Sequence, residues 1–532
     1  MTLGQELRCL AALLVSWFVV NLITLERSPT VWRDEVMFTE PAVRFLQGHG
    51  FTATSWEASP QLPAVFNGPL YSLLLIPWLK LWGIGPVATR SLGLGLGGLA
   101  CFWLWRLCRR RGLLRSPTWR LVGVAVLLCG FSVVWACRNG RYDALGMLLL
   151  VLLVGRVGRG DSPPALRSAA ESPRGRFPAF ASMGTALLAA LLPFAGLYLI
   201  PYVVLVGLVG FALGGRSFWR QLLPPALGLA LGCGLLALLH LGLGTWAATA
   251  AFVTAQTGPS VLGRLGQIPA SWCADPSLLP LALFLVGVLS TRGLGGSPGV
   301  GETVGSAPAG WPGLGPGVIG LAALVGVPAW MTLAGKYASY YGWMTFVPVL
   351  GGVLCVIEQL SPPGGDGESA AASLGAPPSR WLLWTGAMAL VAAATVGLPL
   401  RLLACGLEWR QRDHAAVAQF VRAQVRSDDV VVSGFETYYA VTQHCRQMTL
   451  PSCLRARGGG IPREVTALVG GEELVRELGA LEVSGWVPMA SYESPRYSLP
   501  VRLGRARWYR LTVWRRQAEG AGPENRSRVP EA

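Results

Sequence analysis

Long apolar stretches alternate with short polar connections over the first 400 residues of the chain. Segments 121–134, 144–154 and 222–241 contain no Asp, Glu, Lys or Arg. A helix needs about 20 mainly apolar residues to cross a bilayer, and a helix satisfies its own backbone hydrogen bonds there. The pattern therefore predicts an all-α polytopic membrane bundle rather than a soluble globular domain.

The hydropathy pattern predicts eleven transmembrane helices. They cover residues 9–25, 86–105, 121–137, 142–155, two segments forming a hairpin within 179–214, 222–243, 277–290, 316–334, 342–358 and 381–400. The glycine-rich run 93–98 within the second span predicts close helix packing. The short apolar segment 69–82 contains Pro77 and Lys80, and we expect it to lie at the outer membrane interface.

Arginine-rich connections predict the orientation. Six arginines lie within residues 106–120 and five within 156–176. Cytoplasmic loops carry such an excess, so both connections are expected in the cytoplasm. An odd number of spans then gives a cytoplasmic N-terminus and an extracytoplasmic C-terminal domain in the plasma or inner membrane.

The pattern changes after residue 400. Helical spacing at 415–425 and 469–478, a β-type run at 429–434 and an alternating run at 508–514 predict a small α/β domain. We therefore expect a transmembrane domain over residues 1–400, with a first outer loop at 26–85. An extracytoplasmic α/β domain follows over 401–519, and 520–532 is expected to be a disordered tail.

Composition agrees with a membrane protein. Hydrophobic residues make up 52% and charged residues only 14% of the chain, against about 25% charged in soluble domains. The net charge of +16 lies largely in the arginine loops, so we expect no nucleic-acid partner. Of the eleven cysteines, Cys445 and Cys453 either form a disulfide outside the cell or remain free thiols.

Acidic residues follow the first predicted span. Asp34 and Glu35 begin a stretch with helical spacing at the expected water–lipid boundary. A carboxylate there is suited to act as a general base toward an acceptor, or to bind a divalent cation. The alternative is that Asp34 caps the helix that follows.

The short turn after the third span contains Arg138, Arg141 and Asp143 on the expected outer side, where arginine is disfavoured. A phosphate partner would explain the two arginines, and an Arg–Asp ion pair is the alternative. Lys336 is a further candidate for phosphate, next to tyrosines 340 and 341 that we expect in an interfacial aromatic belt. His49 is expected in a turn rather than at a metal.

Several short motifs occur in a characteristic order. They are Asp34-Glu35-x4-Glu40, Gly48-x-Gly-Phe51, Phe66-Asn-Gly-Pro-Leu-Tyr71, the segment from Gly83 to Arg90, Asp143, and Tyr340 to Pro348. With an outer C-terminal domain, this order resembles the GT-C membrane glycosyltransferases. The nearest branch is the protein O-mannosyltransferase-like and lipid A aminoarabinose transferase-like group.

This resemblance implies an inverting glycosyltransferase that takes a sugar from a polyprenyl-phosphate or dolichyl-phosphate donor. The acceptor would be a lipid, glycan or protein at the outer face. Carried over, Asp34 is the catalytic base or the carboxylate that orients the acceptor, with Glu35 beside it. Asp143 and Glu40 hold the acceptor or a divalent metal cation, and no other cofactor is implied. Arg138, Arg141 and Lys336 are assigned to the donor phosphate on charge and sidedness.

One departure weakens the likeness to the aminoarabinose branch. That branch has a Glu-Lys-Pro-Pro run where this chain has Asn67-Gly68-Pro69.

Two other functions compete with the transferase. A polytopic transporter or lipid flippase would need polar groups near the bilayer midplane and broken helices. A membrane scaffold that binds the cell wall is the third candidate.

Overall fold

The structure, a computed structural model, describes residues 1–56, 62–66, 68–157, 178–257, 261–268, 270, 274–292, 316–334, 339–361, 380–456, 460–479, 485–495 and 509–516. The chain divides into two compact units. Unit 1 comprises residues 1–23, 65–71 and 90–403. Unit 2 comprises residues 24–64, 72–89 and 404–532.

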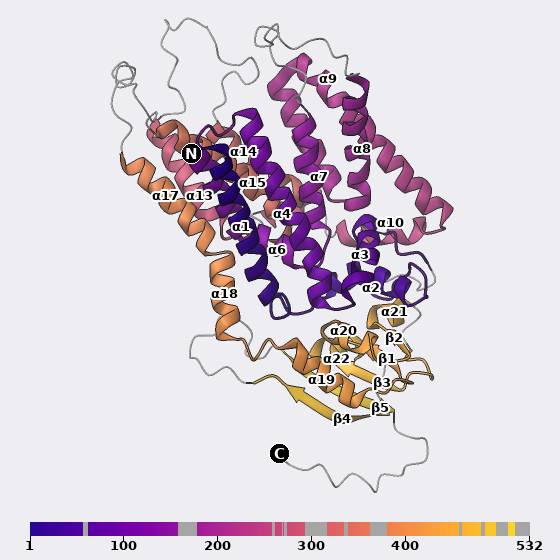
Figure 1. Ribbon diagram of the computed structural model, residues 1–532. Helices are drawn as coiled ribbons and strands as arrows, with labels where there is room; N and C mark the ends of the chain where they lie inside the picture. Colours follow the sequence, from indigo (N-terminus) through magenta and orange to yellow (C-terminus); the bar gives the residue numbers. More distant parts are fainter. Residues whose placement is uncertain are drawn as a thin grey trace, which may run out of the picture. The chain divides into compact units, whose positions relative to one another are not determined.

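Unit 1 is helical in the residues that the structure describes (Figure 1). Its elements are α1 (Leu3–Thr24), α4 (Pro86–Arg111), α5 (Pro117–Cys129), α6 (Phe131–Arg138), α7 (Asp143–Arg156), α8 (Pro178–Ala195), α9 (Leu199–Gly242), α10 (Trp246–Thr257), α11 (Val261–Leu265), α13 (Leu278–Arg292), α14 (Pro316–Leu333), η2 (Ser339–Tyr341), α15 (Trp343–Leu360), α17 (Arg380–Thr395) and α18 (Leu398–Leu407).

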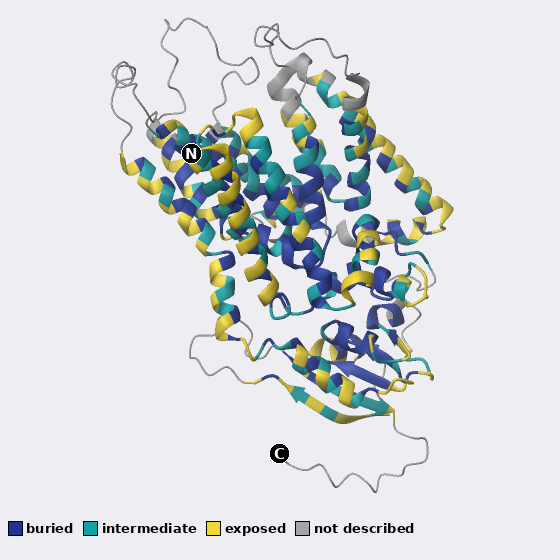
Figure 2. Cartoon of the chain, in the orientation of Figure 1, coloured by how far each residue is buried: buried dark blue, intermediate teal, exposed yellow. Residues whose placement is uncertain are grey.

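Outer helices of unit 1 expose large apolar side chains, which a soluble protein would bury. Val15, Leu187, Leu238 and Met388 are each more than 60% exposed, and Figure 2 shows exposed positions along α1, α9 and α17. Exposed apolar area of this extent marks a surface that contacts lipid. The chain is therefore a multi-pass membrane protein.

Five described helices are long and apolar enough to cross a membrane, or six when the bent pair α5 and α6 counts as one span. Four shorter apolar helices lie at 182–195, 199–209, 278–288 and 317–333. The count of eleven spans stays a prediction.

Helix α9 does not end between the sixth and seventh spans, which the hydropathy pattern separates after residue 214. It runs for 44 residues and includes parts of both predicted spans. Residues 210–220 contain no proline, the residue that interrupts a helix most strongly.

The third predicted span is broken in the middle. Helices α5 and α6 meet at Gly130 with a bend of 59°. A second break, between α17 and α18, packs against the first one. A Cβ atom added to Gly397 would collide with the backbone of Cys129 and Phe131.

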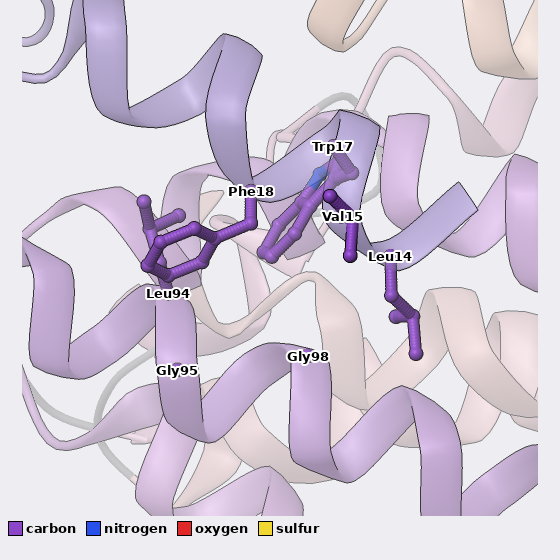
Figure 3. A pocket seen from close by; sticks show the side chains of 7 residues that line it. All are labelled: Leu14, Val15, Trp17, Phe18, Leu94, Gly95 and Gly98. Atoms are coloured by element: carbon purple, nitrogen blue, oxygen red, sulfur yellow. The ribbon is translucent and has the colours of Figure 1, made fainter. Parts of the chain in front are cut away.

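The glycine run in α4 packs closely against another helix, as predicted. A Cβ atom on Gly93 would lie 2.6 Å from the carbonyl oxygen of Cys137, and one on Gly97 would collide with the thiol of that residue. On another side of α4, Gly95 and Gly98 border an apolar groove of about 250 Å³ (Figure 3). Trp17 and Phe18 of α1 point into this groove.

Unit 2 contains a five-stranded mixed sheet. Its elements are α2 (Arg33–Leu46), α3 (Pro69–Trp82, mostly in this unit), α19 (His414–Gln424), β1 (Val430–Ser433), η3 (Phe435–Thr437), α20 (Tyr438–Thr442), β2 (Gln447–Thr449), α21 (Pro451–Ala456), β3 (Ala467–Gly470), α22 (Glu472–Leu478), β4 (Trp486–Glu493) and β5 (Arg510–Arg516). The strand order is β2-β1-β3-β5-β4. Strand β1 is parallel to β2 and β3, and β5 is antiparallel to β3 and β4.

The predicted α/β character is present, with one correction. The expected helix over 469–478 begins only at Glu472, because Ala467–Gly470 forms the central strand β3. The four residues of β3 are all buried, and Leu468 packs with Val432 of β1 and Leu474 of α22. A run that is buried all round does not show the alternation that usually distinguishes a strand from a helix.

Candidate active site

Helix α2 of unit 2 carries the acidic motif of the first loop. Asp34 and Glu35 lie in its first turn, where the partial positive charge of a helix N-terminus stabilises carboxylates. The N-cap residue is Trp32, and it makes no side-chain capping bond. Asp34 lies inside the helix, so the alternative in which it is the N-cap residue is wrong.

Two of the three carboxylates on α2 are fully buried and bound. Glu40 accepts a hydrogen bond from the Thr54 hydroxyl at 2.6 Å on one oxygen and from the Ser55 amide at 2.7 Å on the other. Glu35 accepts a bond from the Tyr439 hydroxyl at 3.1 Å. Both side chains are 0% exposed. These contacts hold the loop and η3–α20 onto α2.

Asp34 differs from its two neighbours in exposure. It is only partly buried, whereas Glu35 and Glu40 are completely enclosed. Of the three acids of the motif, Asp34 is the one that a substrate can reach without unfolding the loop. The assignment of Glu35 to catalysis stays a prediction, and its geometry favours a positioning role.

The predicted arginine turn lies in unit 1, between α6 and α7. Arg141 Nε donates to Asp143 Oδ2 at 3.1 Å, and Asn139 Nδ2 donates to the same oxygen at 3.4 Å. Arg138 Nη1 donates to Asn21 Oδ1 at 2.6 Å. All of these side chains are buried. The ion pair that we considered as the alternative is therefore present.

Tyrosines enclose the Arg141 guanidinium. Arg141 Nη2 donates to the Tyr341 hydroxyl at 3.1 Å, and the guanidinium lies 3.8 Å from the centroid of the Tyr340 ring. The hydroxyls of Tyr142 and Tyr341 are 2.7 Å apart. Burial raises the pKa of the Tyr341 phenol far above its usual value, so this phenol remains protonated at neutral pH.

The expectation that tyrosines 340 and 341 form an interfacial belt is wrong for Tyr341. This side chain is 0% exposed and packs on Arg141. A buried guanidinium needs acceptors and an aromatic surface, and the tyrosines supply both. We refer to Arg138, Arg141, Asp143, Tyr142, Tyr340 and Tyr341 as the arginine–tyrosine cluster.

Two glycines enclose the Tyr142 ring. Gly68, from the Phe66–Tyr71 motif, has a positive φ of 67°, and a Cβ there would lie 3.3 Å from that ring. A Cβ on Gly196 would collide with it. Sequence reasoning missed Asn21, Tyr142 and Gly196 as parts of this cluster. Only the Tyr142 position, between two residues already singled out, offered a signal.

The predicted site residues fall into two sets, and each set belongs to a different unit. Asp34, Glu35 and Glu40 belong to unit 2, whereas Arg138, Arg141 and Asp143 belong to unit 1. A shared role for Asp34 and Asp143 stays a prediction. Lys336 lies outside the described residues.

The residues predicted to bind a divalent cation are engaged by hydrogen-bond donors. Both oxygens of Glu40 and one oxygen of Asp143 accept bonds from N–H or O–H groups. Within the described ranges, no group of three or more His, Cys, Asp or Glu side chains could hold a metal ion. Cation binding by Glu40 and Asp143 stays a prediction.

Two smaller predictions concern unit 2. Cys445 and Cys453 are free thiols rather than a disulfide. His49 lies in a tight turn between Gly48 and Gly50, whose φ angles are 82° and 75°, as we expected.

Comparison with known proteins gives likeness in structure but not in sequence. No family model matches the chain, and no curated protein sequence matches it. The solved structure of ArnT from Cupriavidus metallidurans, bound to undecaprenyl phosphate, is similar at a TM-score of 0.55 and 15% identity, over 98% of this chain and 100% of ArnT. The arabinofuranosyltransferase AftD from Mycobacteria gives a TM-score of 0.47 at 13% identity, over 96% of this chain and 40% of AftD.

The ArnT comparison spans both chains almost from end to end. It shows that this chain shares the fold of ArnT over its whole length.

Proposed function

We propose that this protein is a membrane glycosyltransferase that moves a sugar from a polyprenyl-phosphate donor to an extracytoplasmic acceptor. The whole-length likeness to ArnT, whose structure holds undecaprenyl phosphate, supports a lipid-linked donor. The membrane helices support it too, because a prenyl chain remains in the bilayer while its phosphate lies at the interface.

One observation carries the assignment of the base. On helix α2, Glu35 and Glu40 are fully buried and accept hydrogen bonds, and Asp34 is only partly buried. In the proposed reaction, the Asp34 carboxylate takes the proton of an acceptor hydroxyl or amine. The acceptor atom bonds to the anomeric carbon as the bond from that carbon to the phosphate oxygen breaks. The anomeric centre inverts, and polyprenyl phosphate leaves.

The arginine–tyrosine cluster is proposed to stabilise the leaving phosphate. Cationic groups that are already oriented lower the barrier to charge development, because they need no reorganisation during the reaction. Tyr340, Tyr341 and Asp143 hold the Arg141 guanidinium in one orientation. Asp143 then orients Arg141, and this positioning role supports the proposal better than metal binding. Arg138 and Lys336 are proposed as further phosphate contacts.

The test is Asp34→Asn in a strain from which the native gene has been deleted. Mass spectrometry of surface glycans and lipid-linked sugars would compare the wild type, the variant and the empty deletion. We expect the variant to match the deletion, with the unmodified acceptor and the sugar-loaded lipid both accumulating. General-base catalysis contributes about 10²- to 10⁴-fold, so a loss of this size in the initial rate is expected.

Glu464→Gln is the matched control, because Glu464 is an exposed carboxylate of the same unit. It should transfer sugar at the wild-type rate. Wild-type transfer by Asp34→Asn, at equal protein level in the membrane, would rule out Asp34 as the base.

One feature favours a transporter or lipid flippase as the second candidate. Discontinuous helices with polar groups at the break are typical of transporters. Here the α5–α6 break has the Ser277 hydroxyl accepting the Phe131 amide at 2.9 Å, and Asp275 Oδ1 accepting the Ser277 amide at 2.9 Å. Asp275→Asn separates the two functions. A transporter would lose substrate movement across the membrane, with no change in lipid-linked sugar pools.

A further inference from the structure

A small polar pocket of about 150 Å³ lies in unit 2, between the end of helix α2 and the turn that joins α20 to β2. Arg44 and His49 line the pocket from the end of α2, and Arg446 lines it from the turn between α20 and β2. No Asp or Glu is among the described residues that line it. Three basic side chains therefore surround one pocket without an acidic counter-charge in its wall.

The chain conformation brings these residues to one place. The His49 amide donates to the Arg44 carbonyl at 2.9 Å, and positive φ angles at Gly48 and Gly50 complete the turn. Gln47 Nε2 donates to the Thr442 carbonyl at 2.9 Å, which joins the two sides of the pocket. Arg44 Nε donates to the Thr52 hydroxyl at 2.9 Å, so this guanidinium is held in a defined position.

The groups of negative charge near the pocket are already paired. The carboxylate of Asp429, whose charge acts on Cys445, forms an ion pair with Arg515 at 2.6 Å. The last carbonyls of α2 carry partial negative charge, but those of Val43, Arg44 and Phe45 accept bonds from the amides of Gln47, His49 and Gly48. Burial raises the pKa of the Cys445 thiol to about 12. This thiol is therefore neutral at physiological pH and adds no negative charge.

The volume limits what can bind. Pockets for drug-sized ligands are roughly 300–1,000 Å³, and this pocket is about half the lower bound. A single tetrahedral or planar anion fits such a space, with guanidinium groups that match its oxygens.

We propose that this pocket binds an oxyanion, the phosphate or carboxylate group of a larger molecule or a free anion. Arg44 and Arg446 supply charge-assisted hydrogen bonds, and His49 lies at the rim as an exposed third donor. The site is separate from Asp34 and does not depend on the transferase activity. Arg44 lies ten residues after Asp34 on the same helix, which corresponds to about 15 Å along the axis.

The first test is calorimetric titration of the full-length protein in detergent with inorganic phosphate, at constant ionic strength set by chloride. The wild type should bind phosphate, and Arg446→Gln should bind it at least about tenfold more weakly, because a charged hydrogen bond is lost. Arg446 is exposed, so this substitution leaves the fold intact.

Arg422→Gln is the control, because it removes the same charge from an exposed position of α19, away from the pocket. It should leave the dissociation constant unchanged. Absence of phosphate binding by the wild type, or equal weakening by the two variants, would overturn the proposal.

A second test identifies the source of the oxyanion. Sugar transfer by Arg446→Gln is measured in membranes at limiting and at excess acceptor. Loss at limiting acceptor that recovers at excess shows that the acceptor carries the anion. Unchanged transfer together with lost phosphate binding shows that the pocket binds a free anion. The calorimetry is unaffected if the protein proves not to be a transferase.

Discussion

At the residue scale, the acids of helix α2 divide into two kinds. Glu35 and Glu40 are enclosed and hydrogen-bonded, and Asp34 is accessible. The sequence predicts the position of all three, because they follow an apolar span in a recognisable order. It does not predict which are enclosed, because their partners include Tyr439, more than 400 residues later. Burial of a carboxylate is a tertiary property, and local spacing contains no information on it.

Glu40→Gln should destabilise unit 2. The amide keeps the shape of the side chain, but one of the two carboxylate oxygens becomes an NH2 group. This group then faces the donor of either Ser55 or Thr54. Loss of a buried charged hydrogen bond costs about 1.5–3 kcal/mol. Thermal unfolding in detergent, followed by intrinsic fluorescence, measures the decrease in Tm.

Glu464→Gln is again a suitable comparison for Glu40→Gln, because that carboxylate is exposed, and its Tm should equal that of the wild type. If Glu40→Gln melts at the wild-type temperature, the hydrogen bonds from Thr54 and Ser55 do not stabilise the loop.

At the scale of elements, two helix breaks support each other. The break at Gly130 interrupts the third predicted span, and the break at Gly397 packs on it. Neither glycine distinguishes itself in the sequence, because glycine is common within membrane helices. The spans themselves were largely predictable from hydropathy. The bend was not, because it depends on a segment that lies almost 270 residues away in the chain.

Gly397→Ala should disrupt the packing of the α17–α18 break against the α5–α6 break. Its Cβ would collide with the backbone of Cys129, and backbone cannot move aside as a flexible side chain does. Overpacking of this kind costs about 1–3 kcal/mol or more. We expect a lower Tm and a lower yield of folded protein from the membrane.

Gly351→Ala is the matched control in helix α15, where an added Cβ meets no atom within 4 Å. Because alanine is the better helix former, this variant should be as stable as the wild type or more stable. Equal melting of the two variants would contradict close packing at Gly397.

At the scale of the whole molecule, the loop that follows α1 and the C-terminal domain belong to one unit. Hydropathy and the change of character near residue 400 suggested the membrane domain and the α/β domain. They could not show that residues 24–64 and 72–89 join the latter, since the hydrogen bonds between them connect distant parts of the chain.

The predicted orientation can be tested by labelling. In a variant without native cysteines, Arg446→Cys should react with a membrane-impermeant maleimide in intact cells. Leu113→Cys, next to the first arginine cluster, should react only after permeabilisation. Both positions are exposed, so accessibility to the reagent depends on sidedness alone. The opposite pattern would place the acidic helix in the cytosol, where an extracytoplasmic acceptor does not occur.

The bond between the Leu450 amide and the Thr54 hydroxyl joins residues 396 positions apart, and this has a consequence during synthesis. Ribosomes add about 5–20 residues per second. Helix α2 therefore leaves the ribosome roughly 20–80 s before Tyr439 and Leu450 exist. Until then, Glu35 lacks the hydrogen bond from the Tyr439 hydroxyl, whereas Glu40 already has the Thr54 and Ser55 donors of its own loop. A nascent chain released early would leave the loop incompletely packed.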